Sequence, residues 1–108
     1  MTSRPVIPRA EARRDAEDAL AHYGAEAADE FAVGFISAQR QAYALIGRQP
    51  ASGSTRYAAE LGLPGLHSLP LRQFPYVLFY FERDDAIDVR RILHGRRDIQ
   101  GHMREPPR

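Results

Sequence analysis

The sequence predicts an α+β fold in which an antiparallel helical hairpin packs on a small antiparallel β-sheet, in the order β-α-α-β-β-β. Residues 9–47 carry apolar side chains at helical spacing on either side of Gly24. Residues 74–94 contain two short runs rich in aromatic and β-branched residues, separated by two aspartates, which is typical of a β-hairpin. The 108 residues, of which 44% are hydrophobic, suffice for one modest core in a single domain, residues 1–108.

The N-terminal half predicts an edge strand followed by two helices. Residues 4–8 contain two prolines, which suits an edge strand because proline cannot donate to a sheet ladder. Residues 9–23 are rich in Ala, Glu and Arg and form the first predicted helix, which ends at Gly24. Residues 25–47 form the second helix, with apolar residues three or four positions apart along one stripe. Such a stripe is typical of a core-facing helix.

The second half of the chain predicts a loop and three strands. Residues 49–54 contain Pro, Ser and Gly and form the loop. Residues 66–71 predict a strand, weakened by Pro70, that pairs with the first strand of the hairpin. That first strand, residues 76–81, is apolar at nearly every position, so both of its faces should be covered.

Strand alternation divides the hairpin side chains between two faces. In the second run it places Arg91 on the core face with Val89, where a structural ion pair with Asp98, Glu82 or a helix acid should neutralise it. The helical hairpin covers only one face, so we expect an apolar cluster on the other, as a binding surface for a protein partner. A C-terminal segment folding over that face is the alternative. The residues assigned to this partner-binding face are Tyr76, Leu78, Tyr80, Arg90 and Ile92.

Several separated motifs share one order along the chain. They are Phe74-Pro75-Tyr76, Phe79-Tyr80, RILHGRRDI from Arg91 to Ile99, and a Gly-Ser-x-Arg-Tyr string from Gly53 to Tyr57. In this order and with nearly this spacing, they resemble the motifs of ParE-type toxins of the RelE/ParE superfamily. The resemblance covers nearly the whole chain and implies a RelE/ParE-like fold. It also implies the toxin of a type II toxin–antitoxin system, which binds DNA gyrase and blocks replication without catalysing a reaction.

The resemblance further implies a cognate ParD-like antitoxin that neutralises the toxin by direct binding. The partner-binding face of the hairpin then becomes the antitoxin-binding surface, on which a disordered antitoxin segment folds. The target surface is expected to be basic, and no motif spells out the contact. Its candidate residues are Arg56, Arg72, Arg96 and Arg97.

A metal-free, ribosome-dependent mRNA endonuclease of the RelE type is the alternative function. It would need a group to deprotonate the ribose 2′-hydroxyl and arginines to hold the phosphate. Its candidate catalytic residues are Arg56, Arg72 and His94. The chain contains no lysine, so the lysine cluster of these ribonucleases is missing, and we interpret His94 as structural. A third possibility is a non-toxic module that keeps the fold only to bind an antitoxin.

Composition and spacing argue against other chemistry. There are no cysteines, and the four histidines show no metal-ligand spacing, so we expect no metal and no cofactor. A net charge of +1 does not favour sequence-specific DNA binding by this chain alone. The longest apolar run is too short for a membrane span and the N-terminus is not signal-like, so we expect a cytoplasmic protein. Residues 1–3 and 103–108 should be frayed ends.

Overall fold

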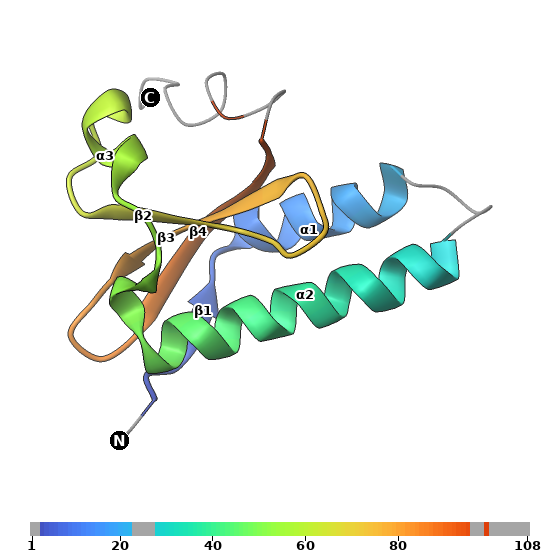
Figure 1. The fold of residues 1–108 in the computed structure, drawn as a ribbon, viewed down its shortest axis with the longest axis horizontal. Helices are drawn as coiled ribbons and strands as arrows, with labels where there is room; N and C mark the ends of the chain where they lie inside the picture. Colours follow the sequence, from blue (N-terminus) through green and yellow to red (C-terminus); the bar gives the residue numbers. More distant parts are fainter. Residues whose placement is uncertain (1–2, 23–27, 96–98, 100–108) are drawn as a thin grey trace.

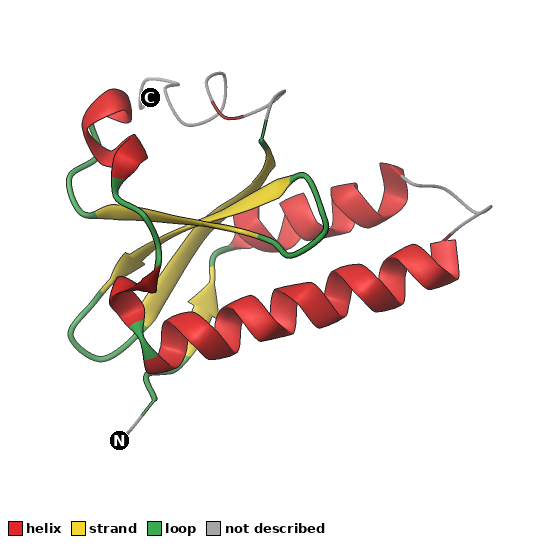
Figure 2. Ribbon diagram, in the orientation of Figure 1, coloured by secondary structure: helices red, strands yellow, loops and turns green. Residues whose placement is uncertain are grey.

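The computed structural model describes residues 3–22, 28–95 and 99 of the chain. The elements are β1 (Val6–Pro8), α1 (Ala10–His22), α2 (Ala28–Arg48), η1 (Pro50–Ser52), α3 (Arg56–Leu61), β2 (Leu66–Pro70), β3 (Tyr76–Glu82) and β4 (Ile87–His94). The α+β class and the predicted order of strands and long helices are confirmed, with η1 and α3 inserted before β2 (Figures 1 and 2). The expected frayed tail, residues 103–108, lies outside the described residues, as do residues 1 and 2.

The four strands form a mixed sheet in the order β1-β4-β3-β2. The β2–β3 and β3–β4 pairs are antiparallel, as predicted. β1 is the expected edge strand, but it pairs with β4 in parallel, with Val6 opposite Ile87. The sheet is therefore not antiparallel throughout. Side-chain alternation is the same in parallel and antiparallel strands, so the sequence pattern does not indicate the direction of β1.

The helices α1 and α2 run antiparallel, and both contribute to the core against one face of the sheet (Figure 1). α1 turns the small residues Ala12, Ala16 and Ala19 inward, which lets the helix approach β4 closely. α2 contributes the fully buried side chains of Phe35 and Ile46. Burial of these apolar side chains stabilises the fold by about 25 cal/mol per Å² of apolar area removed from water.

A β-bulge in β4 changes which side chains face the helices. The pairing with β3 skips Arg90, which is the extra residue between Val89 and Arg91. The alternation predicted from the sequence is therefore wrong beyond Val89. Ile92 joins Val89 in the helix-side core, whereas Leu93 packs on the opposite face.

The short helix α3 packs on that opposite face, beside β2. Its Leu61 packs with Phe79 and Leu93 in a second buried cluster, to which Ile99 also belongs. α3 ends at Gly62, whose φ of 67° is the left-handed conformation that glycine adopts easily. Both faces of β3 are thus covered, as its continuous apolar run predicted, but α3 itself was not predicted.

Candidate functional site

The hairpin face predicted to bind a partner is the face that the helices cover. Tyr76, Leu78, Tyr80 and Ile92 are between 0% and 4% exposed and belong to the main core. The prediction that they form an exposed surface is wrong, because alternation separates the two faces of a strand without showing which one the helices cover. Arg90 is partly exposed, and its guanidinium lies 5.6 Å from the centre of the Phe81 ring on the other face.

Tyr80 has a structural role in this arrangement. Its hydroxyl donates to the Pro50 carbonyl at 2.6 Å and accepts from the Gly53 N–H at 3.0 Å. Burial raises the pKa of this hydroxyl, and the hydrogen bond from Gly53 opposes that shift. A Cβ at position 53 would lie 2.6 Å from the hydroxyl oxygen, so only glycine allows the contact without a shift. Tyr80 therefore fixes the loop between α2 and α3.

The candidate ribonuclease residues are divided between the two faces of the sheet. Arg56 begins α3, and its guanidinium lies 4.9 Å from the centre of the Tyr57 ring. His94 lies on the helix side, where its ring is 5.5 Å from that of Tyr76. The sheet thus separates Arg56 from His94. His94 packs at the strand end, in agreement with the structural role expected from the sequence.

Arg72, the remaining candidate of that set, lies in the turn between β2 and β3, beside α2 (Figure 1). Two hollows of about 300 and 280 Å³ lie between this turn, β2 and α2. They share Ala38, Gln41 and Arg72 as lining residues and together form what we call the α2–β2 groove. Its other lining residues are Gly34, Ser37, Ala42, Leu45, Arg48, Leu69, Pro70 and Gln73.

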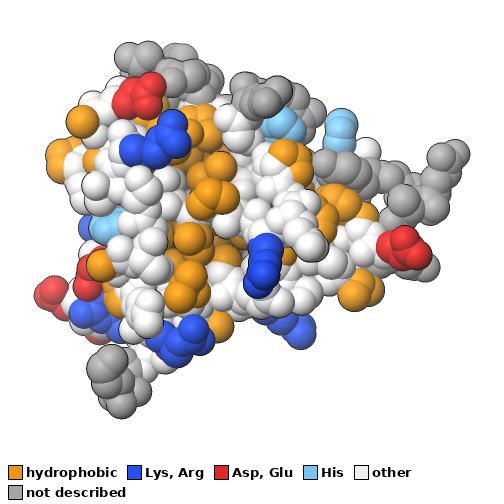
Figure 3. Space-filling view, in the orientation of Figure 1, with side chains coloured by type: hydrophobic (Ala, Val, Ile, Leu, Met, Phe, Trp, Pro, Cys, Tyr) orange, Lys and Arg blue, Asp and Glu red, His pale blue; other side chains and the backbone are white. Residues whose placement is uncertain are grey.

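The walls of the α2–β2 groove carry positive charge and no acid. Residues 31–48 contribute Arg48 to the lining and residues 66–73 contribute Arg72, whereas neither segment holds an Asp or Glu. In Figure 3, apolar side chains occupy much of the middle of the visible face, with a basic side chain among them, and acidic side chains lie nearer its margins. A chain with a net charge of only +1 therefore has a locally cationic groove.

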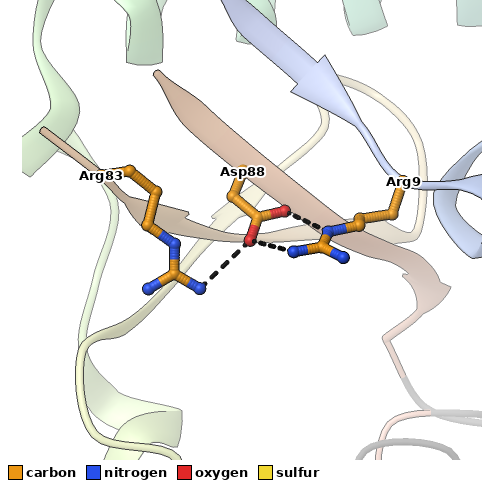
Figure 4. A network of polar contacts seen from close by, with 3 residues as sticks. All are labelled: Arg9, Arg83 and Asp88. Carbon is orange, nitrogen blue, oxygen red and sulfur yellow. Dashed lines mark hydrogen bonds and ion pairs between the residues drawn. The ribbon is translucent and has the colours of Figure 1, made fainter. Parts of the chain in front are cut away.

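A second group of arginines surrounds Asp88 at the β3–β4 turn (Figure 4). The Asp88 carboxylate accepts from Arg9 Nε at 2.9 Å and from Arg83 at 3.1 Å, and Arg4 pairs with Glu82 nearby. We call these five residues the hairpin-end network. Burial alone would raise the pKa of Asp88, but the hydrogen bonds from Arg9 and Arg83 outweigh it and lower that pKa below its ordinary value. The same contact raises the pKa of Arg9.

Arg91 forms a further internal ion pair. Its guanidinium donates two hydrogen bonds to Asp15 of α1, at 2.7 and 2.9 Å, and the Ile92 N–H donates to the same carboxylate at 3.0 Å. β1 pairs only with Ile87–Val89, so Asp15 takes a backbone donor of β4 that has no strand neighbour. The sequence predicted a structural ion pair for Arg91, and the partner is one of the helix acids it allowed.

Arg96, Arg97 and Asp98 lie outside the described residues. Within the described part of the chain, no group of three His, Asp or Glu side chains is arranged to hold a metal ion. No helix there is long and apolar enough to cross a membrane.

Sequence reasoning missed the α2–β2 groove, although a signal for it was present. Residues 31–48 and 66–73 lack acids in a chain that contains 14 of them. Such a gap in the charge pattern marks two segments that can share a cationic surface. What the pattern alone does not show is that the fold brings these two segments together.

Comparisons with known proteins agree with the fold described above. The family model described as "ParE toxin of type II toxin-antitoxin system, parDE" matches residues 6–99. A solved structure described as the chromosomal ParDE toxin–antitoxin system from P. aeruginosa is similar, with a TM-score of 0.69 and 17% sequence identity. That likeness covers 85% of this chain and 96% of the other. No curated protein sequence shows a significant match.

Proposed function

We propose that this chain arrests growth by binding DNA gyrase in the cytoplasm, because it belongs to the ParE toxin family of type II toxin–antitoxin systems. We also propose that a ParD-like antitoxin neutralises it by direct binding, since the similar solved structure is described as a ParDE system. On this proposal the chain acts by binding and catalyses nothing itself. The family match over residues 6–99 supports the toxin class, and the gyrase target goes beyond it.

The observation that carries the non-catalytic proposal is the separation of Arg56 from His94 by the sheet. A ribonuclease needs its general base and its phosphate-binding groups within hydrogen-bond reach of one substrate. Here His94 packs against Tyr76 on the helix side, while Arg56 begins the helix that covers the opposite face. This placement supports binding over RNA cleavage.

The target contact is assigned to exposed arginines. Arg56, at the start of α3, and Arg72, in the turn between β2 and β3, are both exposed. Arg96 and Arg97 complete the candidate set from outside the described residues. Reversing the charge of Arg96 and Arg97 tests that pair: we expect weaker toxicity from a folded variant. Undiminished toxicity would remove both residues from the target surface.

The function is tested by expressing the chain alone and with a ParD-like antitoxin encoded beside it. We expect growth arrest in the first case and normal growth in the second. The purified chain should inhibit gyrase supercoiling and leave mRNA intact in a ribosome-programmed cleavage assay. Cut mRNA with normal supercoiling would replace the gyrase proposal with the RelE-type ribonuclease. Normal growth with both assays silent would favour the non-toxic binding module.

A further inference from the structure

The outward-facing sides of the two long helices differ in charge. On α1, the exposed positions include Glu11, Arg14 and Asp18, which is the usual composition of a helix face that meets water. On α2, Arg40 is the only charged residue in the 17 positions 31–47. The outer side of α2 therefore lacks the charges that would suit it to water alone.

Apolar side chains stand on this outer side of α2. Val33 and Ile36 are 71% and 38% exposed, on the part of the helix that points away from the buried Phe35 and Ala42. α2 also lies at the margin of the fold (Figure 1). Because the two residues are neighbours on a weakly charged face, they mark an interaction surface. The exposed residues of this surface, which we call the α2 outer stripe, are Glu30, Val33, Ile36, Ser37, Arg40 and Ala44.

The α2 outer stripe carries opposite charges on the two sides of its apolar residues. Glu30 and Arg40 are separated by about 15 Å along the helix, which is too far for them to pair within one chain. A second copy of α2 can lie antiparallel to the first, with a two-fold axis at the level of Phe35. Each Glu30 then lies at the level of Arg40 of the other copy. The stripe is therefore complementary to itself, as a two-fold interface requires.

The middle of the stripe fits the same antiparallel arrangement. Val33 lies at the level of Ser37 of the second copy, where the small serine leaves room for the branched side chain. Ile36 of each copy lies beside the two-fold axis, so the two isoleucines become neighbours. The contact then has an apolar centre and charged ends, which is the common anatomy of a protein interface.

We infer that the α2 outer stripe binds a second copy of this chain, helix against antiparallel helix, in a two-fold homodimer. One helix from each copy makes a small interface, so the dimer should be weak, with a Kd of roughly 1–100 µM. The stripe shares only Ser37 with the lining of the α2–β2 groove. The inference does not require gyrase or an antitoxin, so it can fail while the proposed function stands.

The test is sedimentation equilibrium of the purified full chain over a concentration range that brackets this Kd. Wild type should pass from monomer to dimer. Arg40→Glu and Glu30→Arg each place like charges opposite one another, so each should weaken the dimer at least tenfold. An equal mixture of these two variants should associate as wild type does, because each chain supplies the charge that the other lacks. Arg14→Glu and Glu17→Arg make the same charge changes at exposed positions of α1 and are the matched controls.

Three results overturn the inference: wild type that stays monomeric throughout, a mixture no more dimeric than either variant alone, or equal weakening by the α1 controls. A monomeric wild type whose antitoxin binding is weakened by Val33→Asp would assign the stripe to the antitoxin instead.

A second readout tests the antiparallel register. The chain has no cysteine, so Val33→Cys and Ser37→Cys each introduce a single thiol. When the two variants are mixed and oxidised with glutathione disulfide, disulfides should join Val33→Cys chains to Ser37→Cys chains several-fold faster than they join like chains. Equal rates for like and unlike chains would refute the register.

Discussion

The arginines of the hairpin-end network and those of the α2–β2 groove differ in what neutralises them. At the hairpin end, Asp88 holds Arg9 and Arg83 by direct ion pairs. In the groove, Arg48 and Arg72 extend from two segments that contain no acid. The first group connects β1 to the β3–β4 turn, and the second faces a hollow with an apolar floor.

This difference separates two roles that composition alone cannot distinguish. An arginine paired within the fold contributes to stability and offers little net charge to a partner. An arginine beside an acid-free wall contributes little to stability and raises the local potential. Mutations at the two kinds of site should therefore change different measurements. Substitutions of Asp88 in the hairpin-end network and of Arg48 and Arg72 in the groove test that separation.

The largest effect on stability is expected from Asp15→Ala. The Asp15 carboxylate accepts two hydrogen bonds from Arg91 and one from the Ile92 N–H, and its side chain is only 11% exposed. Its loss leaves a partly buried guanidinium and a strand N–H without this partner, so the free energy of unfolding should fall by about 3 kcal/mol. Urea denaturation measures the change. Asp18→Ala, at an exposed position of the same helix, is the control, and equal effects of the two variants would contradict the prediction.

A smaller loss of stability is expected from Tyr80→Phe, a variant that also tests whether Tyr80 belongs to the antitoxin-binding surface. The variant removes the hydroxyl that binds Pro50 and Gly53, so stability should fall by about 1–2 kcal/mol. Tyr57→Phe is the control, because Tyr57 contacts Phe79 through its ring and the variant keeps that ring. Antitoxin affinity should not change in the folded Tyr80 variant. Weaker binding with unchanged stability would restore Tyr80 to the antitoxin surface.

The order of the elements was predictable from periodicity and turn residues. The second strand of the hairpin, residues 87–94, coincides with β4, and the apolar stripe of residues 25–47 places α2 on the core. These features depend on local spacing, which the sequence records directly. α3 was missed because its six residues are too short for a helical period to be recognised, and because Pro and Gly residues flank it on both sides.

The exposed surface was harder to predict because it depends on long-range contacts. The bulge at Arg90 inverts the alternation of β4, and nothing in the local pattern marks it. The assignment of Tyr76 and Leu78 to an exposed face failed for a related reason. Both faces of β3 are apolar, and the sequence does not tell which one receives α1 and α2. The candidate groove arises only when the β2–β3 turn folds beside α2.

The next prediction concerns the hairpin-end network and its dependence on pH. Asp88→Asn should lower the free energy of unfolding by about 1 kcal/mol at pH 7, a small value because both arginines are about half exposed. The pKa of Asp88 is lower in the folded state than its ordinary value of 3.8. The contribution is therefore present above pH 3.8 and is lost as the pH falls through the lower folded value.

Urea titrations of wild type and Asp88→Asn at several pH values measure this effect. The stability difference should be constant near neutrality and should disappear in acid. Asp84→Asn, an exposed change in the same turn, controls for the loss of one negative charge. A difference that grows as the pH falls would contradict the lowered pKa of Asp88.

The smallest effect on stability is expected from Arg48→Ala/Arg72→Ala, and it completes the comparison. Both side chains are exposed and their walls hold no acid, so the free energy of unfolding should change by no more than about 0.5 kcal/mol. Thermal unfolding checks this directly, with Asp88→Asn as the reference for a paired site. A loss as large as that of Asp88→Asn would show that these arginines are needed for folding. Unchanged stability would leave an exposed cationic groove that the fold does not require, which is the condition for assigning it to a partner.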